Sequence, residues 1–322
     1  MGTDLRFVMP LLRTINKAED LRMNYQVLCS RLAISVQELQ DTALSVNEIE
    51  PLLFQDGEYL VLSKKLDLLN AKTIYDGISQ RGRFALKDVT TSTNLELMEE
   101  KDNLVSGDAL VAEIQTEGRS LRGTKWLSSI GSNIMLSMAI KFDSLQQMIG
   151  FSLAIGVATV NALELAGVKG VKLKWPNDVI YQNKKLAGIL IESVPSTDGE
   201  FFAIVGVGLN VHNSQSISAT IDRPYTTLEE MGYNLERNDI CIALINEIKY
   251  VANTFRRKGF VSFLDTWNRH DVLIGHTVEV AISSHRNIVG KVAGVNRQGE
   301  LILDSNAGRT AVRSGHIVSI RN

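Results

Sequence analysis

Cysteine is scarce in this sequence, and the two cysteines present lie far apart. Cys29 and Cys241 stand alone among 322 residues, and neither has neighbours at the spacing of metal ligands. A disulfide framework or a zinc site is therefore not expected, and we predict no metal site built from protein ligands. Reduced thiols are the simpler interpretation, so we expect a cytoplasmic protein.

An excess of either charge and a long apolar run are also missing. The formal net charge is −2, so no global basic field would attract nucleic acid or an anionic membrane. The most apolar stretch, 148–168, is interrupted by Ser152, Asn161 and Glu164, which favours a buried helix over a membrane span. The first residues carry charges and no small-residue cleavage site follows, so we expect no secretory signal.

The signatures of several enzyme classes are absent. No Walker A sequence occurs, and Gly206-Val207-Gly208-Leu209-Asn210 lacks the third glycine of a dinucleotide-binding fingerprint, although its glycines permit close approach of a ligand or another backbone. The histidines lie late in the chain, and none accompanies a nucleophilic Ser or Cys in a known signature. A hydrolase triad is therefore unsupported. The residues present fit better a reaction that needs positioned cations instead of a protein nucleophile.

The order of predicted elements divides the chain into three parts. A length of 322 residues suggests two or three domains. In residues 1–65 we predict three short helices and then a hairpin. Ser35 begins the third helix, and Glu38 completes a capping box. The pair Asp56-Gly57 suits the hairpin turn. This is the order of a winged helix-turn-helix domain.

Residues 66–270 alternate strand-like and helix-like segments and predict an α+β domain. Strands are expected at 109–112, 133–138, 171–175, 188–192 and 202–208, and helices at 93–102, 147–166 and 238–258. Residues 271–322 hold short strands separated by turn residues, which predicts a small β-barrel. So small a barrel has little core of its own.

A glycine-rich loop, residues 116–126, packs Gly118, Arg119, Arg122, Gly123 and Lys125 into a short stretch. Its backbone N–H groups and guanidinium forks would suit closure over phosphates or a carboxylate. A solvated hairpin tip is the plainer alternative, which composition alone favours.

The segment 174–178 ends an apolar strand with a lysine, a tryptophan and a proline that terminates strand pairing. An Asx turn with a core tryptophan explains most of this segment but gives Lys174 no role. Lys184 and Lys185 then lead into a second apolar strand. Taken alone they fit a hairpin with a basic turn. If the neighbouring strand ends place lysines from both segments at one rim of the core, an anion-binding site is favoured instead.

In their order along the chain, these segments resemble the bifunctional biotin–protein ligase and biotin-operon repressor family of bacteria. The matching pieces are Ser92-Thr93-Asn94, Gln115, Gly118-Arg119, Arg122-Gly123, Lys174-Trp175-Pro176-Asn177-Asp178, Lys185-Leu186-Ala187-Gly188-Ile189 and Gly206-Val207-Gly208-Leu209-Asn210. The likeness runs from about Leu68 to the C-terminus. It implies a class II synthetase-like ligase core (66–270) and an SH3-like barrel (271–322), which follow the winged helix-turn-helix domain (1–65) predicted from the order of elements.

The resemblance also implies a reaction and its partners. ATP and biotin would give biotinyl-5′-adenylate, with Mg²⁺ screening the phosphates, and a lysine of a biotin carboxyl carrier protein would then accept the biotin. Because the biotin carboxylate is already ionised at pH 7, no catalytic His or Cys is needed. The protein then has to position the two substrates and neutralise the charge of the reacting phosphates. Family members often form homodimers with the adenylate bound, and biotin would be the corepressor wherever operator DNA is bound.

Carried over position by position, the resemblance assigns the site residues. Lys185 and Arg119 are the expected catalytic cations. Biotin is expected to contact Ser92, Thr93, Asn94, Gln115, Arg119, Ser120, Leu121, Lys185 and Gly188. The nucleotide is expected to contact Arg122, Trp126, Lys174, Asn177, Asn210 and Tyr225. The last of these stands where the family often has a tryptophan, and its phenol ring can stack on adenine.

One departure from the family pattern lies in the glycine-rich loop. The family's loop commonly reads Gly-Arg-Gly-Arg-Arg-Gly, whereas here Leu121 replaces an arginine that helps to retain the adenylate. Its absence removes a charge-assisted contact. We therefore expect weaker retention of the intermediate unless Arg122 or Lys125 substitutes.

A second departure lies in residues 1–65, which hold seven Lys or Arg against nine Asp or Glu. The expected recognition helix, 35–45, carries Glu38 and Asp41 and no Lys or Arg. Since DNA binding needs local positive charge, two interpretations compete. Either a working repressor takes its cations from Arg22, Arg31 and the wing, or the module has lost operator binding. The sequence favours the second.

Three functions remain in competition. We favour a biotin–[acetyl-CoA-carboxylase] ligase. A lipoate or octanoate ligase would share the core architecture, but the 174–178 segment and the glycine-rich loop belong to the biotin side. A biotin-sensing DNA-binding regulator without ligase activity is the alternative from another class.

Overall fold

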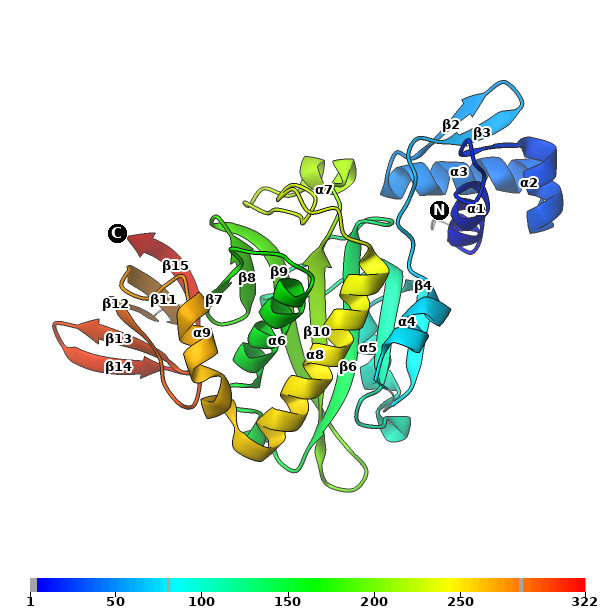
Figure 1. Ribbon diagram of the computed structural model, residues 1–322. Helices are drawn as coiled ribbons and strands as arrows, with labels where there is room; N and C mark the ends of the chain where they lie inside the picture. Colours follow the sequence, from blue (N-terminus) through cyan, green and yellow to red (C-terminus); the bar gives the residue numbers. More distant parts are fainter. Residues whose placement is uncertain (1–4, 80–81, 284–285, 322) are drawn as a thin grey trace.

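The computed structural model describes residues 5–79, 82–283 and 286–321. Three sheets follow one another along the chain: one of three strands near the N-terminus, one of seven strands in the middle, and one of five strands at the C-terminal end (Figure 1). Within the described residues, no helix is long and apolar enough to cross a membrane.

The N-terminal unit combines three helices with a small antiparallel sheet. Its elements are α1 (Val8–Ile15), α2 (Tyr25–Leu32), α3 (Val36–Ile49), β1 (Arg22–Asn24), β2 (Leu53–Asp56) and β3 (Tyr59–Leu62). The capping box is confirmed, because Ser35 accepts from the backbone of Glu38 and the Glu38 side chain accepts from the backbone of Ser35. Strand β1 was not predicted, since it is three residues long and its partner β3 is distant in sequence.

The central sheet has the strand order β4-β5-β6-β10-β9-β8-β7. Only the β4–β5 pair is parallel among the pairings of this sheet in the described chain, so the sheet is mixed and the predicted α+β class is confirmed. The strands are β4 (Phe84–Thr90), β5 (Ala109–Gln115), β6 (Asn133–Phe142), β7 (Lys172–Lys174), β8 (Asp178–Tyr181), β9 (Lys184–Pro195) and β10 (Phe201–Asn210). Strands β4 and β8 were missed by the sequence prediction.

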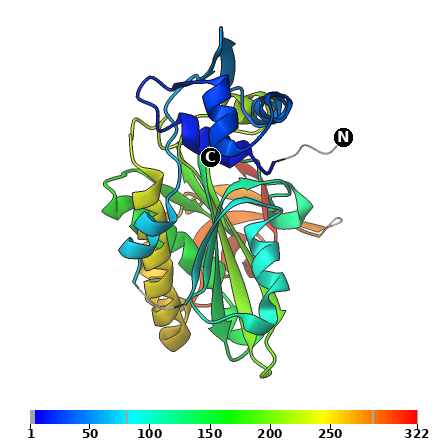
Figure 2. The same cartoon turned by 90° about the vertical axis from the view of Figure 1, so that its right-hand side faces the viewer.

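Helices cover both faces of this sheet (Figures 1 and 2). Ala203, Val205 and Val207 of β10 point into the core shared with α6 (Phe151–Leu165) and α8 (Arg237–Lys258). Phe202 and Ile204 pack on the opposite face with α5 (Thr93–Glu99). The alternation follows from the two-residue period of a strand. The remaining helices are α4 (Ala71–Gly77), α7 (Gln215–Thr220) and α9 (Leu264–His270), with 3₁₀ turns at Lys101–Asn103, Leu121–Gly123, Leu145–Met148 and Phe260–Phe263.

The C-terminal strands form one antiparallel sheet in the order β14-β13-β12-β11-β15. They are β11 (Thr277–Ser283), β12 (Arg286–Val295), β13 (Leu301–Ser305), β14 (Gly308–Val312) and β15 (His316–Arg321), the last of which was not predicted. Val278, Val280 and Leu301 belong to the same apolar cluster as the central sheet. The buried Trp175 donates its indole N–H to the carbonyl of Gly299 at 3.2 Å. The C-terminal strands therefore share a continuous core with the middle of the chain.

A buried ion pair joins α8 to the central sheet. Arg237 and Glu113 are both fully buried, and the guanidinium lies 3.0 Å from the carboxylate. The same guanidinium donates to the carbonyls of Asn133 and Asp67, and Glu113 also accepts from the backbone N–H of Leu69. One cation thus ties the segment that leaves the N-terminal unit to two strands of the central sheet.

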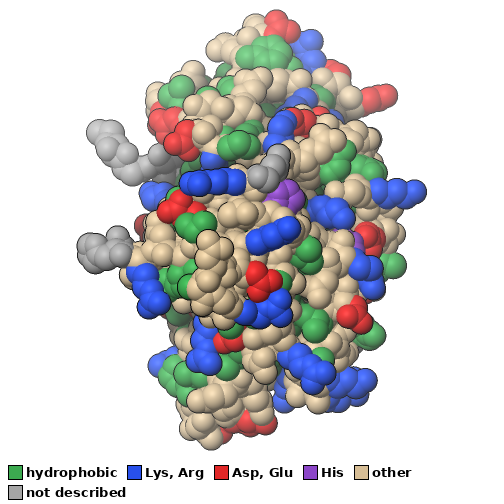
Figure 3. Space-filling view, turned by 90° about the vertical axis from the view of Figure 1, so that its left-hand side faces the viewer, with side chains coloured by type: hydrophobic (Ala, Val, Ile, Leu, Met, Phe, Trp, Pro, Cys, Tyr) green, Lys and Arg blue, Asp and Glu red, His purple; other side chains and the backbone are tan. Residues whose placement is uncertain are grey.

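Charge on the face that carries the C-terminal strands is mixed. Figure 3 shows Lys and Arg side chains scattered among Asp and Glu there, without one continuous basic field among the described residues of that face. This agrees with the nearly balanced charge of the whole chain.

Candidate active site

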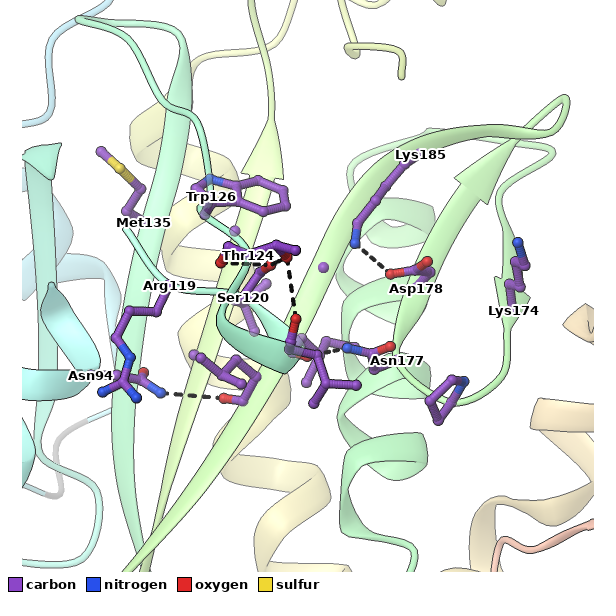
Figure 4. Close-up of a pocket in the computed structure, with 18 of the residues that line it drawn as sticks. Asn94, Arg119, Ser120, Thr124, Trp126, Met135, Lys174, Asn177, Asp178 and Lys185 are labelled. Atoms are coloured by element: carbon purple, nitrogen blue, oxygen red, sulfur yellow. Dashed lines mark hydrogen bonds and ion pairs between the residues drawn. The ribbon is translucent and has the colours of Figure 1, made fainter. Parts of the chain in front are cut away.

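One pocket gathers most of the predicted site residues on the α5 side of the central sheet (Figure 4). Its cavity volume is about 420 Å³, within the usual range for small-molecule sites. The predicted residues that line it are Ser92, Thr93, Asn94, Gln115, Arg119, Ser120, Leu121, Trp126, Lys174, Asn177, Lys185 and Gly188. Segments far apart in the sequence thus meet at one site, as the resemblance implied.

At one end of the pocket, uncharged polar side chains form a hydrogen-bonded chain. The Gln115 side-chain oxygen accepts from the backbone N–H and the hydroxyl of Thr93 at 2.8 and 3.0 Å. The Ser137 hydroxyl reaches both the Thr93 hydroxyl, at 2.7 Å, and the Asn94 oxygen, at 2.6 Å. Because Thr93, Asn94 and Ser137 are buried, these groups are held in fixed orientations. This end suits a neutral ligand with several donors and acceptors.

Arg119 is linked to the polar end through Glu192. The guanidinium lies 2.9 Å from one carboxylate oxygen of Glu192, and the Asn94 amide donates to the other oxygen at 2.9 Å. The arginine side chain is 41% exposed, so the ion pair contributes little to stability. Its effect is geometric: it holds the loop cation beside Asn94 at the polar end of the pocket (Figure 4).

At the other end, Lys185 and Asp178 point toward each other from the neighbouring strands β9 and β8 (Figure 4). The ammonium lies 2.5 Å from the carboxylate and 5.8 Å from the centre of the Trp126 ring. Arg223 and Lys174 line the cavity as well. This cationic end suits a ligand that is anionic or becomes more anionic during reaction.

Glycines explain how the pocket holds bulky side chains against the sheet. A β-carbon added to Gly208 would lie 2.4 Å from Cε2 of Trp126, and one added to Gly206 would lie 2.6 Å from the oxygen of Asn94. Gly188 is also close, since its added β-carbon would meet Lys185 and Trp126 at 3.0 and 3.1 Å. The close approach predicted for the 206–210 segment is thus made by two side chains of this chain.

The 174–178 segment forms the turn between β7 and β8, with a cis peptide bond between Trp175 and Pro176. The Asn177 amide donates to the Ile189 carbonyl at 2.8 Å, and the Ile189 N–H donates to the Asn177 carbonyl at 3.0 Å. These bonds fix the turn to β9. Lys174 at the end of β7 is therefore held at the rim of the pocket.

Two predicted nucleotide residues are placed differently. The amide of the buried Asn210 is bonded to Asn133, to the Lys185 carbonyl and to the Thr226 carbonyl. The Tyr225 hydroxyl lies 2.6 Å from that of Ser218. Neither Asn210 nor Tyr225 is among the residues that line the pocket. The Arg122 side chain lies outside the described residues.

Several residues of the site were not found from the sequence. Ser137 and Glu192 bond to residues that line the pocket without lining it themselves. Both lie inside strands, where their local pattern is that of ordinary strand residues. The start of β15 and the residue before it contribute Gly315, His316 and Ile317 to the lining, with the Nδ1 atom of His316 buried and without a hydrogen-bond partner in the described structure. No local motif signals such a contribution, because it depends on how distant segments pack.

Within the described residues, no group of three or more His, Cys, Asp or Glu side chains is placed to hold a metal ion. Asp178 is the carboxylate among the residues lining the pocket, and it faces Lys185. A magnesium ion brought in by a nucleotide needs few protein ligands, because phosphates and water fill most of its positions.

Comparison with known proteins identifies the family. Residues 86–210 match the profile of the Biotin/lipoate A/B protein ligase family. The chain is 35% identical over 283 residues to the Bifunctional ligase/repressor BirA of Escherichia coli (strain K12), covering 86% of this chain and 85% of that protein. It is 31% identical to the Biotin--[acetyl-CoA-carboxylase] ligase of Mycobacterium tuberculosis, covering 72% and 87%.

Solved structures give the same result. The biotin protein ligase from Aquifex aeolicus in complex with biotin and ATP superposes with a TM-score of 0.64 at 31% identity, covering 74% of this chain and 99% of that one. Together with the pocket that joins a polar end to a cationic end, this likeness shows that the chain belongs to the biotin–protein ligase family.

Proposed function

We propose that this protein is a biotin–[acetyl-CoA-carboxylase] ligase, which activates biotin with ATP and transfers it to a lysine of a biotin carboxyl carrier protein. The observation that carries the proposal is the pocket itself, in which an uncharged hydrogen-bonding end, with Arg119 beside it, is continuous with an end bearing Lys185 and Lys174. The names of the relatives described above support the same activity. The free cysteines fit the cytoplasmic location that we include in the proposal.

The proposed chemistry has two steps. A biotin carboxylate oxygen attacks the α-phosphorus of ATP, the bond to the β-phosphate oxygen breaks, and pyrophosphate leaves. The deprotonated amine of the acceptor lysine then attacks the acyl carbon of biotinyl-5′-AMP, and AMP leaves as the amide forms. Lys185 and Arg119 are proposed to neutralise charge around the acyl phosphate, which is electrostatic catalysis without a protein nucleophile.

The two ends of the pocket support an assignment of the ligands. Biotin is proposed to contact Ser92, Thr93, Asn94, Gln115, Arg119, Ser120, Leu121, Lys185 and Gly188, since hydrogen-bonding groups of both kinds meet there. The nucleotide is proposed to occupy the side of Lys174, Asn177 and Trp126. The polar atoms of Asn210 and Tyr225 bond to other protein groups. We therefore propose that these two residues hold the nucleotide-binding side of the pocket in place from outside its lining.

Magnesium is proposed to enter with ATP. Its chemistry there would be to screen the phosphates. Asp178 is the pocket carboxylate that could supply one ligand, which fits an ion carried mainly by its substrate.

For the N-terminal unit we propose a winged helix-turn-helix ancestry, supported by the order of three helices followed by the β2–β3 hairpin. Its expected recognition helix, α3, carries Glu38 and Asp41 and no Lys or Arg. Two proposals remain: a repressor that takes its cations from Arg22, Arg31 and the wing, and a module that has lost operator binding. The acidic helix favours the second. A gel shift with the organism's own biotin-operon upstream DNA, biotin and ATP separates them.

The ligase proposal also includes a homodimer with the adenylate bound. Sedimentation of the protein with and without biotin and ATP tests it: a ligand-dependent shift from monomer to dimer is expected, and an unchanged monomer contradicts it.

Biotin-dependent exchange between ATP and labelled pyrophosphate tests the central proposal. Exchange with biotin, and little with lipoate or octanoate, is expected. Exchange only with lipoate or octanoate would support the alternative ligase of the same fold. Biotin binding without any exchange would support the biotin-sensing regulator.

A further inference from the structure

The carboxylate of Glu50 connects the N-terminal unit to two loops of the pocket. Glu50 directly follows α3 and is 3% exposed. It accepts hydrogen bonds from the Ser129 hydroxyl at 2.8 Å and the Ser214 hydroxyl at 2.6 Å. The backbone N–H groups of Gln215 and Ser216 donate to it as well, at 2.8 and 3.3 Å. One side chain of the N-terminal unit thus takes all four bonds from the ligase core.

The first loop leads from Glu50 to the backbone of Lys185. Ser129 follows the glycine-rich loop, and its backbone N–H donates to the Asn133 side chain at 3.0 Å. The Asn133 amide donates to Asn210 at 2.9 Å, and the Asn210 amide donates to the Lys185 carbonyl at 3.4 Å. Asn133 and Asn210 are both buried, so this route has little freedom to rearrange.

The second loop reaches the same residue from the other side. Ser214 precedes α7, and Ser218 within α7 lies 2.6 Å from the Tyr225 hydroxyl. Residues on either side of Tyr225 pair with Lys185: the Lys185 N–H donates to the Pro224 carbonyl at 3.1 Å, and the Thr226 N–H donates to the Lys185 carbonyl at 2.9 Å. Both routes therefore converge on the backbone that carries the expected catalytic lysine.

The charge on Glu50 matters for these bonds. Burial alone would raise the pKa of Glu50, but the hydrogen bonds from Ser214, Ser129, Gln215 and Ser216 outweigh it and hold the pKa below its usual range. An ionised carboxylate accepts at both oxygens, whereas a glutamine would present N–H groups to donors on one side. The isosteric change to glutamine therefore breaks part of the network without creating a cavity.

We propose that Glu50 is a positioning residue for Lys185, so that the N-terminal unit braces the adenylation site whether or not it binds DNA. The inference rests on the proposed function, because it assigns Lys185 to the bound adenylate. An ordinary contact between two packed units is the alternative. That alternative would lower stability or ligand affinity by the same factor whether or not Lys185 is present.

Binding of a hydrolysis-resistant biotinyl-adenylate analogue to the full chain separates these explanations. Glu50→Gln is compared with the wild type by calorimetric titration, with Glu19→Gln on the exposed surface of the same unit as the matched control. We expect Glu50→Gln to weaken binding about tenfold, since hydrogen bonds to a charged group are lost. Glu19→Gln should stay within about twofold of the wild type.

The decisive comparison repeats Glu50→Gln in a Lys185→Met background. If Glu50 acts through Lys185, its effect should shrink to less than about threefold there, because the two residues are coupled. An equal loss in both backgrounds, or wild-type binding by Glu50→Gln, overturns the inference. Should Glu50→Gln fail to fold, Ser214→Ala removes one donor to the carboxylate and is judged by the same criteria.

Pyrophosphate exchange by the wild type keeps the two proposals apart. Absence of biotin-dependent exchange in the wild type refutes the ligase proposal. If the wild type exchanges normally, two results refute only the role of Glu50. One is wild-type binding by Glu50→Gln, and the other is an equal loss of binding with and without Lys185.

Discussion

The buried pair of Arg237 and Glu113 allows a quantitative prediction about stability. Replacing Arg237 with methionine keeps most of the side-chain volume but removes the guanidinium, which leaves the Glu113 carboxylate buried without its cation. Breaking a buried pair in this way costs about 3–5 kcal/mol. Two backbone carbonyls, of Asn133 and Asp67, lose their donors as well, so the upper part of that range is expected.

Thermal and urea unfolding measure the effect. For a domain of roughly 200 residues, each kcal/mol shifts the midpoint by about 2–4 °C, so Arg237→Met should unfold about 10 °C below the wild type. Arg257→Met is the matched control, because Arg257 lies on the same helix, is exposed and donates to the backbone carbonyl of Asn253 one turn earlier. Its midpoint should change by no more than about 2 °C.

A double variant tests the reasoning itself. Adding Glu113→Leu to Arg237→Met removes the stranded carboxylate and should recover part of the lost stability, since an apolar pair can replace a buried ion pair. Recovery will be incomplete because Glu113 also accepts from the Leu69 N–H. A midpoint for Arg237→Met within about 2 °C of the wild type, or a double variant as unstable as the sum of the single changes, would refute the argument.

Three further predictions concern the site and its support. Gly208→Ala should weaken biotin and nucleotide binding about five- to 150-fold in calorimetry, because its β-carbon would stand 2.4 Å from Trp126 and overpacking of this kind costs about 1–3 kcal/mol. Leu121→Arg should slow release of biotinyl-adenylate about tenfold in a filter-binding assay, since a charge-assisted contact is restored. Burial raises the pKa of Asp271 to about 6, against hydrogen bonds from Leu273 and Trp267. The stability linked to this group is present below about pH 4 and is lost as the pH rises through about 6, so Asp271→Asn should stabilise by up to about 3 kcal/mol at pH 8 and much less near pH 4.

Each of these has an outcome that contradicts it. Full affinity in Gly208→Ala would mean that Trp126 does not rest on the sheet when ligand is bound. Unchanged release by Leu121→Arg would mean that another cation already retains the adenylate. A stabilisation by Asp271→Asn that is equal at pH 4 and pH 8 in urea unfolding would show that the effect is not linked to ionisation.

The sequence predicted elements with strong local signals and missed those that depend on distant partners. The capping box at Ser35 and the long helices α6 and α8 depend on residues that are close together in the sequence. The predicted bounds of the two helices agree with the observed ones to within a few residues. Strands β1 and β8 have three and four residues, too few for a two-residue period to stand out. Their existence depends on the strands that pair with them.

The same distinction applies to the pocket. Lys185 and Arg119 stand in segments whose order resembles a known family, so the sequence alone predicted a shared site, and both residues line the pocket. Glu192 and Glu50 lie in segments with no such signal. Glu192 accepts from Asn94 across 98 residues of sequence, and Glu50 accepts from Ser216 across 166. The role of a buried carboxylate becomes clear only once its donors are located.

The position of Trp175 has a consequence for cutting the chain into fragments. Its indole lies beneath the C-terminal strands and is bonded to Gly299, and Val278 and Leu301 belong to the same apolar cluster. A fragment ending near residue 270 would expose this surface to water, including the turn that holds Lys174. Such a fragment should be prone to aggregation and protease cleavage at that turn, so a minimal enzyme for biotechnological tagging has to retain the C-terminal strands.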